Sequence, residues 1–191
     1  ARIIDERSFT LALIQMRNAL QQFLKDEPFI LVRAQDGRSE HYVFERLKQL
    51  GLDRLPLRVV AWSEYGQRMH HYLGREQKQG IKCVVLDDAA YSGETIKRSL
   101  HALKDAGVDA DKIFVGLAGA SRGGFNTIDW FAKHRYVGVA MPAWSEGFDA
   151  ADIEALSKMY AIPRSDLDGH VASPGMRSFT TTWFHVADNV S

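Results

Sequence analysis

The sequence from residue 83 to residue 95 is Cys83-Val84-Val85-Leu86-Asp87-Asp88-Ala89-Ala90-Tyr91-Ser92-Gly93-Glu94-Thr95. Its apolar beginning, rich in β-branched residues, predicts a buried strand that runs into two adjacent carboxylates. A tight turn with Ser92 and Gly93 follows, and Thr95 opens a segment with helical periodicity. Since open α/β sheets bind ligands at the carboxyl ends of their strands, we expect a binding site here.

The residue types in this segment favour a phosphorylated sugar as the ligand. Backbone amides at a helix N-terminus bind a phosphate dianion, and the helix dipole assists them. Ser92 and Thr95 add hydroxyl donors, and Gly93 allows close approach of the backbone. Asp87 and Asp88 are placed to accept hydrogen bonds from vicinal ribose hydroxyls and to help hold Mg²⁺ on the ligand. The competing interpretations are a chance acidic strand end before a capped helix, or a pair of metal-binding carboxylates.

Strands and helices alternate along the rest of the chain as far as about residue 140. The expected strands are 29–32, 57–62, 81–86, 113–117 and 136–140, and the expected helices are 6–25, 39–50, 95–106 and a short one near 125–131. This alternation predicts an α/β fold with a parallel sheet flanked by helices on both faces. A further helix over 149–160, a loop over 163–177 and a strand over 178–186 follow. We therefore expect a core over 1–145 and a C-terminal appendage over 146–191, within one domain.

Composition narrows the classes of function. The 191 residues carry 24 basic and 24 acidic side chains, so no global charge attracts nucleic acid or acidic membranes, although local basic patches stay possible. The single cysteine, Cys83, excludes an internal disulfide, and we expect it to be a buried thiol. No apolar stretch approaches the ~20 residues that span a bilayer, and no secretory signal is evident, so we expect a cytoplasmic protein. The chain begins at Ala1, which leaves trimming or excision from a larger protein open.

The segment 83–95 resembles the 13-residue signature of type I phosphoribosyltransferases. That signature has four apolar residues, two acids, two apolar residues, a variable one, Ser or Thr, Gly, a variable one and Thr, and this chain matches every restrictive position. The resemblance implies a type I phosphoribosyltransferase-like fold whose C-terminal appendage forms a hood over the sheet. It also implies that the phosphoribosyl group is bound by Asp87, Asp88, Ala89, Ala90, Tyr91, Ser92, Gly93, Glu94 and Thr95.

The resemblance extends more loosely from about residue 28 to residue 140. Arg33, Ala34 and Gln35 occupy the place of the family's diphosphate loop, in which Arg33 is the expected bidentate donor. Ala34 and Gln35 stand where relatives carry glycines. Residues 63–80 fall where relatives have a flexible catalytic loop, and the candidate side chains there are Tyr65, Arg68, Arg75 and Lys78.

The reaction implied by the resemblance is transfer of a phosphoribosyl group from phosphoribosyl diphosphate to a nitrogen acceptor, with Mg²⁺ as the cofactor. Asp87 and Asp88 would act catalytically by orienting the ribose and steadying an oxocarbenium-like transition state. Tyr91 replaces the Asp of enzymes that use 6-oxopurines, which argues against purine salvage of that kind. Tyr91, together with Trp183 and His185 in the appendage, is an acceptor-binding candidate, although for the appendage the pattern favours a strand that packs Trp183 into the core. A homodimer is expected by the same resemblance.

Two other functions remain open at this stage. The altered diphosphate loop favours a regulator or sensor that has the fold, binds a phosphosugar or nucleotide, and has lost turnover. Tyrosine at position 91 resembles RNA-binding regulators of pyrimidine operons, which have the same fold. A domain excised from a longer nucleic-acid-linked or defence protein is the third possibility, and it is the least supported.

Overall fold

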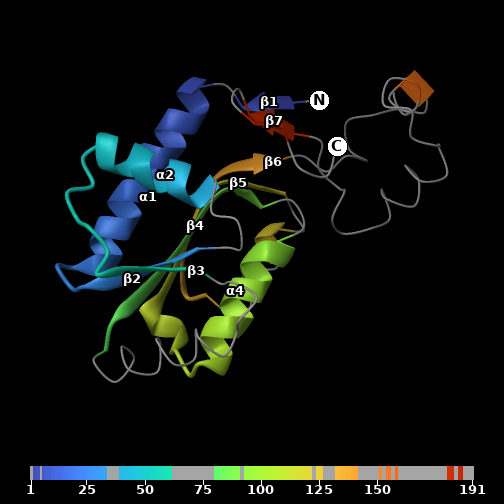
Figure 1. Cartoon of the computed structure of the whole chain (residues 1–191). Coiled ribbons are helices and arrows are strands. Elements are labelled where there is room, and N and C mark those ends of the chain that lie inside the picture. Colours follow the sequence, from blue (N-terminus) through green and yellow to red (C-terminus); the bar gives the residue numbers. More distant parts are fainter. Residues whose placement is uncertain are drawn as a thin grey trace.

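A computed structural model represents the whole chain (Figure 1). It describes residues 2–4, 6–33, 39–61, 80–90, 93–121, 124–126, 132–141, 151, 154–155, 158, 180–182 and 185–186. A large parallel sheet, the helices that cover it and a small second sheet lie within these residues.

The large sheet has five parallel strands. They are β2 (Phe29–Arg33), β3 (Arg58–Ala61), β4 (Lys82–Ala90), β5 (Ile113–Ser121) and β6 (His134–Met141), in the spatial order β3-β2-β4-β5-β6. The chain moves outward from β2 to β3, returns to the centre at β4, and then moves the opposite way through β5 to β6. The strand order therefore reverses between β2 and β4, which is where open α/β sheets place their ligands. The predicted parallel α/β sheet is confirmed.

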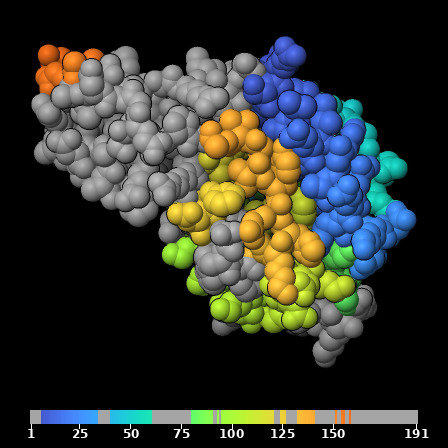
Figure 2. All heavy atoms as spheres, turned by 180° about the vertical axis from the view of Figure 1, so that it is seen from behind, coloured from blue at the N-terminus to red at the C-terminus, as the bar shows by residue number. Residues whose placement is uncertain are grey.

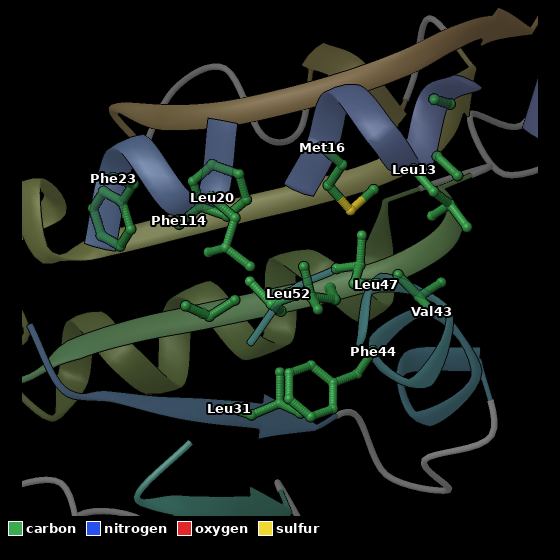
Figure 3. Close-up of a cluster of buried hydrophobic side chains, with 14 of the residues drawn as sticks. Leu13, Met16, Leu20, Phe23, Leu31, Val43, Phe44, Leu47, Leu52 and Phe114 are labelled. Atoms are coloured by element: carbon green, nitrogen blue, oxygen red, sulfur yellow. The ribbon is translucent and has the colours of Figure 1, made fainter. Parts of the chain in front are cut away.

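Helices lie on both faces of this sheet (Figure 1). α1 (Glu6–Leu24) and α2 (Ser39–Gln49) share one face, and α4 (Glu94–Asp105) lies on the other, followed by the 3-10 helix η1 (Ala110–Lys112). Each face has its own buried cluster. On the α1/α2 face, apolar residues of both helices meet β4 and β5, as Figure 3 shows for Met16, Leu47 and Phe114. On the α4 face, Ile96, Leu100 and Leu103 meet the opposite sides of the strands.

The first helix follows from its apolar spacing. Phe9, Leu13, Met16 and Leu20 recur at intervals of four and three, and all four are buried as predicted. The last carbonyls of α1 have no partner within the helix, and Lys82 at the start of β4 supplies one. Its Nζ donates to the carbonyls of Phe23 and Leu24, and pairs with Glu27 Oε1 at 2.9 Å.

Close packing holds α1 against β5 and β6 of the large sheet. In the space-filling view, α1 (blue) and β6 (orange) lie side by side (Figure 2). A Cβ atom added at Gly138 would lie 2.4 Å from Ala12 Cβ and 2.7 Å from the Ala118 carbonyl oxygen. Only glycine therefore fits at position 138 without a shift of the backbone.

Three predicted strands differ clearly from those observed. The strand expected over 113–117 extends to Ser121. The strand expected over 81–86 continues through the two aspartates to Ala90, because β5 extends beside it to Ser121 and pairs with its last residues. The strand expected over 178–186 is instead a short antiparallel pair, β7 (Thr180–Thr182) and β8 (His185–Val186).

The small sheet joins both ends of the chain. Strand β1 (Arg2–Ile4), which the sequence did not lead us to expect, pairs in parallel with β7, with Ile3 opposite Thr181. Its spatial order is β1-β7-β8. Residues of the predicted C-terminal appendage are thus paired with a strand that directly precedes α1.

Among the described residues, no helix combines the length and the apolar character needed to cross a membrane.

Candidate functional site

The two aspartates lie in the part of β4 that extends past β2. The last recorded pair between β2 and β4 is Val32 with Val85, whereas β4 stays paired with β5 as far as Ala90. Asp87 and Asp88 therefore have β5 on one side and the end of β2 on the other. Both are buried, with exposed fractions of 9% and 4%.

The backbone of β4 is irregular at the second aspartate. The ladder pairs Asp87 with Leu117 and Ala89 with Gly119, and records no bridge for Asp88 between them. The amides of Asp88 and Ala89 instead donate to carboxylate oxygens, at 2.9 Å to Asp87 Oδ1 and at 2.8 Å to Asp88 Oδ1. This arrangement is typical of Asp, whose short side chain competes with the ladder for backbone amides.

The regular alternation of β4 is interrupted at the two aspartates. Leu86 belongs to the buried cluster beneath α1 and α2, and Ala89, three residues further on, belongs to the same cluster. Ala90 belongs to the cluster beneath α4. In a regular strand, residues three apart lie on opposite faces, so Asp87 and Asp88 occupy the place where the facing of the strand changes.

Asp88 carries an acceptor that the described part of the chain leaves without a hydrogen bond. Its Oδ2 atom is buried and has no partner there, although Oδ1 accepts from Ala89. Buried polar atoms are nearly always hydrogen-bonded, because leaving one unsatisfied costs about 1–3 kcal/mol, more for a charged group. An oxygen in this state is suited to accept a hydrogen bond from a ligand hydroxyl or to contact a cation.

The helix that follows β4 has an N-cap that supplies no side-chain acceptor to its first amides. The N-cap of α4 is Gly93, a buried residue at φ 75° and ψ 2°, a left-handed conformation that glycine adopts without strain. A glycine has no side chain to accept from the first-turn amides, and the third helical residue, Ile96, cannot form a capping box. The amides at the start of α4 are therefore donors for an anion, with the positive end of the helix dipole behind them.

The segment after β5 packs tightly against the end of β4. A Cβ atom added at Gly124 would lie 2.2 Å from the Ala90 carbonyl oxygen, so only glycine allows this approach. Sequence reasoning did not give Gly124 this role, although the Gly123-Gly124 pair after a strand was the available signal.

The other predicted site residues fall into two groups. Arg33 is the last residue of β2 and is half-buried at the same edge of the sheet, Thr95 is exposed in the first turn of α4, and His185 lies in β8 opposite Thr182. Ala34, Gln35, Tyr65, Arg68, Arg75, Lys78, Tyr91, Ser92 and Trp183 lie outside the described residues. The structure therefore brings Arg33, Asp87, Asp88, Gly93 and Thr95 to one edge of one sheet.

Cys83 lies on β4 upstream of the acids and is buried. Burial raises the pKa of its thiol to about 12, because a thiolate would lose its solvation there. The residue is thus part of the core, as predicted. In the described part of the chain, no group of three or more His, Cys, Asp or Glu side chains is arranged to hold a metal ion.

A tyrosine of α2 packs between the helices on the α1/α2 face. Tyr42 is half-buried and stacks on Phe9 of α1, with ring centroids 6.2 Å apart. Burial raises the pKa of its phenol, the charge of Arg46 lowers it, and the charges of Glu6 and Asp88 raise it further.

Comparison with known proteins gives the following. No protein-family model and no curated protein sequence matches the chain. Among solved structures, an APRTase from Giardia lamblia complexed with 9-deazaadenine is similar at 13% identity and a TM-score of 0.44, over 67% of this chain and 78% of that one. A hypoxanthine-guanine-xanthine phosphoribosyltransferase is similar at 12% identity and a TM-score of 0.46, over 76% of this chain and 84% of that one.

Proposed function

We propose that the carboxyl edge of β4 binds a pentose 5-phosphate, and that the chain is a phosphoribosyltransferase using phosphoribosyl diphosphate. The observation that carries the proposal is the juxtaposition within residues 83–95. Asp88 has a buried Oδ2 atom that accepts no hydrogen bond from the described residues. Gly93, five residues further on, is the N-cap of α4 and offers no side chain to the first amides of that helix. One feature suits sugar hydroxyls and the other suits a phosphate dianion.

The proposed roles follow from position. The first amides of α4 and the Thr95 hydroxyl hold the 5-phosphate, and Asp87 and Asp88 orient the ribose. Arg33, at the end of the neighbouring strand, binds the diphosphate as a bidentate donor. No protein nucleophile is needed, because displacement of diphosphate requires positioning of the acceptor nitrogen and stabilisation of developing positive charge on the sugar.

Mg²⁺ is the proposed cofactor, carried mainly by the diphosphate of the ligand. The free Oδ2 atom of Asp88 fits such a cation, since Mg²⁺ prefers carboxylate and phosphate oxygens. When bound, the ion would neutralise the diphosphate leaving group. The chain's own contribution is to hold the sugar, while the appendage (residues 146–191) forms a hood. Trp183 and His185 from this hood, together with Tyr91 from the 83–95 segment, contact the acceptor. The proposed assembly is a homodimer.

The first test is ligand binding by calorimetry with phosphoribosyl diphosphate and Mg²⁺. Asp88→Asn is expected to weaken binding about tenfold or more, because a hydrogen bond to an ionised acceptor is lost. Asp105→Asn makes the same change at the exposed C-terminal end of α4, and should bind like the wild type. Equal binding by both variants would show that Asp88 does not contact the ligand.

A second test addresses the phosphate end of the site. Thr95→Asp adds a carboxylate to the first turn of α4, which favours the helix through its dipole but repels a phosphate dianion. We expect the variant to melt no lower than Thr95→Asn, its uncharged counterpart of the same size, and to lose at least about tenfold more affinity for ribose 5-phosphate. Unchanged affinity in Thr95→Asp would place the phosphate elsewhere.

A sensor without turnover is the second candidate. It is favoured by Ala34 and Gln35, which replace the glycines of the diphosphate loop. The charge balance of the chain gives no sign of an RNA surface, so the sensor's ligand would be a phosphosugar or nucleotide. Diphosphate release with a panel of nucleobases distinguishes the two. Release with any base supports the transferase, and tight binding without release supports the sensor.

A further inference from the structure

The backbone on both sides of Asp88 is held by side-chain oxygens. The peptide unit before its Cα atom donates the Asp88 N–H to Asp87 Oδ1 at 2.9 Å. The peptide unit after it donates the Ala89 N–H to Asp88 Oδ1 at 2.8 Å. Since peptide units are planar and the two soft dihedral angles of Asp88 lie between them, these two hydrogen bonds together restrain its conformation.

The strand ladders do not supply this restraint. The ladder between β4 and β5 has bridges at Asp87 and Ala89 but records none at Asp88 between them. The ladder between β5 and β6 lacks a bridge at the same level, at Ala118, and the last recorded pair of β4 with β2 is at Val85. A buried amide outside the ladder requires another acceptor, and Asp87 provides one for the amide of Asp88.

The oxygens of Asp88 have different surroundings. Its Oδ1 atom holds the Ala89 amide, whereas its Oδ2 atom is buried and accepts no hydrogen bond from the described residues. Because buried acceptors are nearly always satisfied, Oδ2 is the atom of this carboxylate that suits a sugar hydroxyl. The direction of the side chain depends on the backbone of Asp88, and hence on the hydrogen bond that Asp87 accepts.

We propose that Asp87 is a positioning residue: its Oδ1 atom holds the amide of Asp88 and thereby aims Asp88 Oδ2 at the sugar. Asp87 then supports binding as a hydrogen-bond acceptor for the backbone, and its negative charge is not what the ligand requires. The inference rests on the proposed function, and it divides between the two acids a task that the sequence pattern assigned to both.

The test compares two substitutions of Asp87 that remove the same charge. Asp87→Asn keeps an oxygen that can accept from the Asp88 amide, whereas Asp87→Ala keeps none. In calorimetry with phosphoribosyl diphosphate and Mg²⁺, Asp87→Ala should lose about tenfold in affinity, and Asp87→Asn should recover most of that loss. Equal losses in the two variants would show that the charge of Asp87 matters, as expected of a direct ligand contact, and would overturn the positioning role.

The same two substitutions at Asp111 are the control. Asp111 belongs to η1, which directly precedes the start of β5 and so lies at the opposite edge of the sheet from the acids, and it pairs with Lys133 at 2.9 Å. Both variants of Asp111 should bind within about twofold of the wild type.

Two further measurements separate positioning from a general effect on packing. In an Asp88→Asn background, Asp87→Ala should cause no further loss of affinity, because the oxygen that it aims is already altered. Without ligand, the Asp88 amide should exchange its hydrogen at least about tenfold faster in Asp87→Ala than in the wild type, and Asp87→Asn should restore the slow exchange. If Asp87→Ala does not fold, the comparison of the two Asn variants decides, and Asp87→Asn should bind several-fold more tightly than Asp88→Asn.

The outcomes that overturn the inference differ from those that overturn the function. Wild-type binding together with an unprotected Asp88 amide, or with an additive loss in the double variant, contradicts the positioning role alone. Failure of the wild-type chain to bind the ligand contradicts the proposed function and the aiming of Asp88 at a sugar.

Discussion

At the scale of single residues, glycines hold the surroundings of the site in place. Gly124 brings the segment after β5 onto the Ala90 carbonyl, and Gly138 allows α1 to contact β5 and β6. Both contacts are tight, but only the first adjoins the proposed ligand. Substitutions at these two positions can therefore distinguish an effect on folding stability from an effect on ligand binding.

We expect Gly124→Ala and Gly138→Ala each to lower the free energy of unfolding, by about 1–3 kcal/mol, since an added methyl group overlaps backbone or Cβ atoms. Only Gly124→Ala should also weaken ligand binding, because it displaces the end of β4 that carries the acids. Urea denaturation and calorimetry measure the two effects. A loss of affinity in Gly138→Ala as large as that in Gly124→Ala would argue against a local cause.

The sequence predicted the place of Asp87, Asp88 and Gly93 in the fold, because their types form a recognisable local pattern at a strand end and a helix start. Their chemical roles stay predictions. The irregular backbone at Asp88 was not predicted, because it depends on the continuation of β4 beside β5, which is a tertiary effect.

At the scale of elements, the connection between α1 and β4 lies at the opposite edge of the sheet from the site. Lys82 donates to the last carbonyls of α1, lies 4.7 Å from the centre of the Phe23 ring, and pairs with Glu27. A cation at a helix C-terminus is favoured by the dipole. This cluster anchors the start of β4 and hence the strand that carries the aspartates.

The ion pair predicts a pH dependence of stability. The hydrogen bond from Lys82 is the main cause that lowers the pKa of Glu27 from 4.5; partial burial opposes it, and the charges of Lys82 and Lys112 reinforce it. A carboxyl group with a lowered pKa in the folded state contributes stability above pH 4.5, and this contribution is lost as the pH falls through the folded-state value.

Glu27→Gln should therefore flatten the fall in urea midpoint between about pH 5 and pH 3 relative to the wild type. Glu45→Gln, which removes a pair within α2, is the matched control. Its effect should be small, because its partner Lys48 is 34% exposed whereas Lys82 is 8% exposed. Identical pH profiles for the wild type and Glu27→Gln would contradict the assigned role.

Elements with strong periodicity were predicted almost to the residue. α1 was expected over 6–25 and spans Glu6–Leu24, and α2 was expected over 39–50 and spans Ser39–Gln49, because apolar spacing and flanking Pro28 and Gly51 mark their limits. β1 was not predicted, since three residues carry no periodic signal and the strand exists only because β7 pairs with it. Short strands that form only by pairing with distant residues are therefore the elements that cannot be predicted from a single sequence.

At the scale of the whole molecule, the pairing of β1 with β7 joins the segment before α1 to the predicted hood. We expect Ile3→Pro to disrupt this pairing, because proline removes a backbone donor from the strand. The large sheet, of which β1 is not a strand, should melt at nearly the same temperature. Limited proteolysis with mass spectrometry should show faster cleavage near Thr181 in the variant than in the wild type. Equal cleavage rates would mean that β1 does not hold β7.

The same pairing has a consequence for folding during synthesis on the ribosome. Arg2 and its partner Thr180 are far apart in the sequence, so Thr180 is translated long after Arg2. The contacts of β4 with β2 and β5 span far fewer residues, so the five-stranded core can assemble before β1 has its partner. The attachment of β1 to β7 should accordingly be a late step in the maturation of this fold.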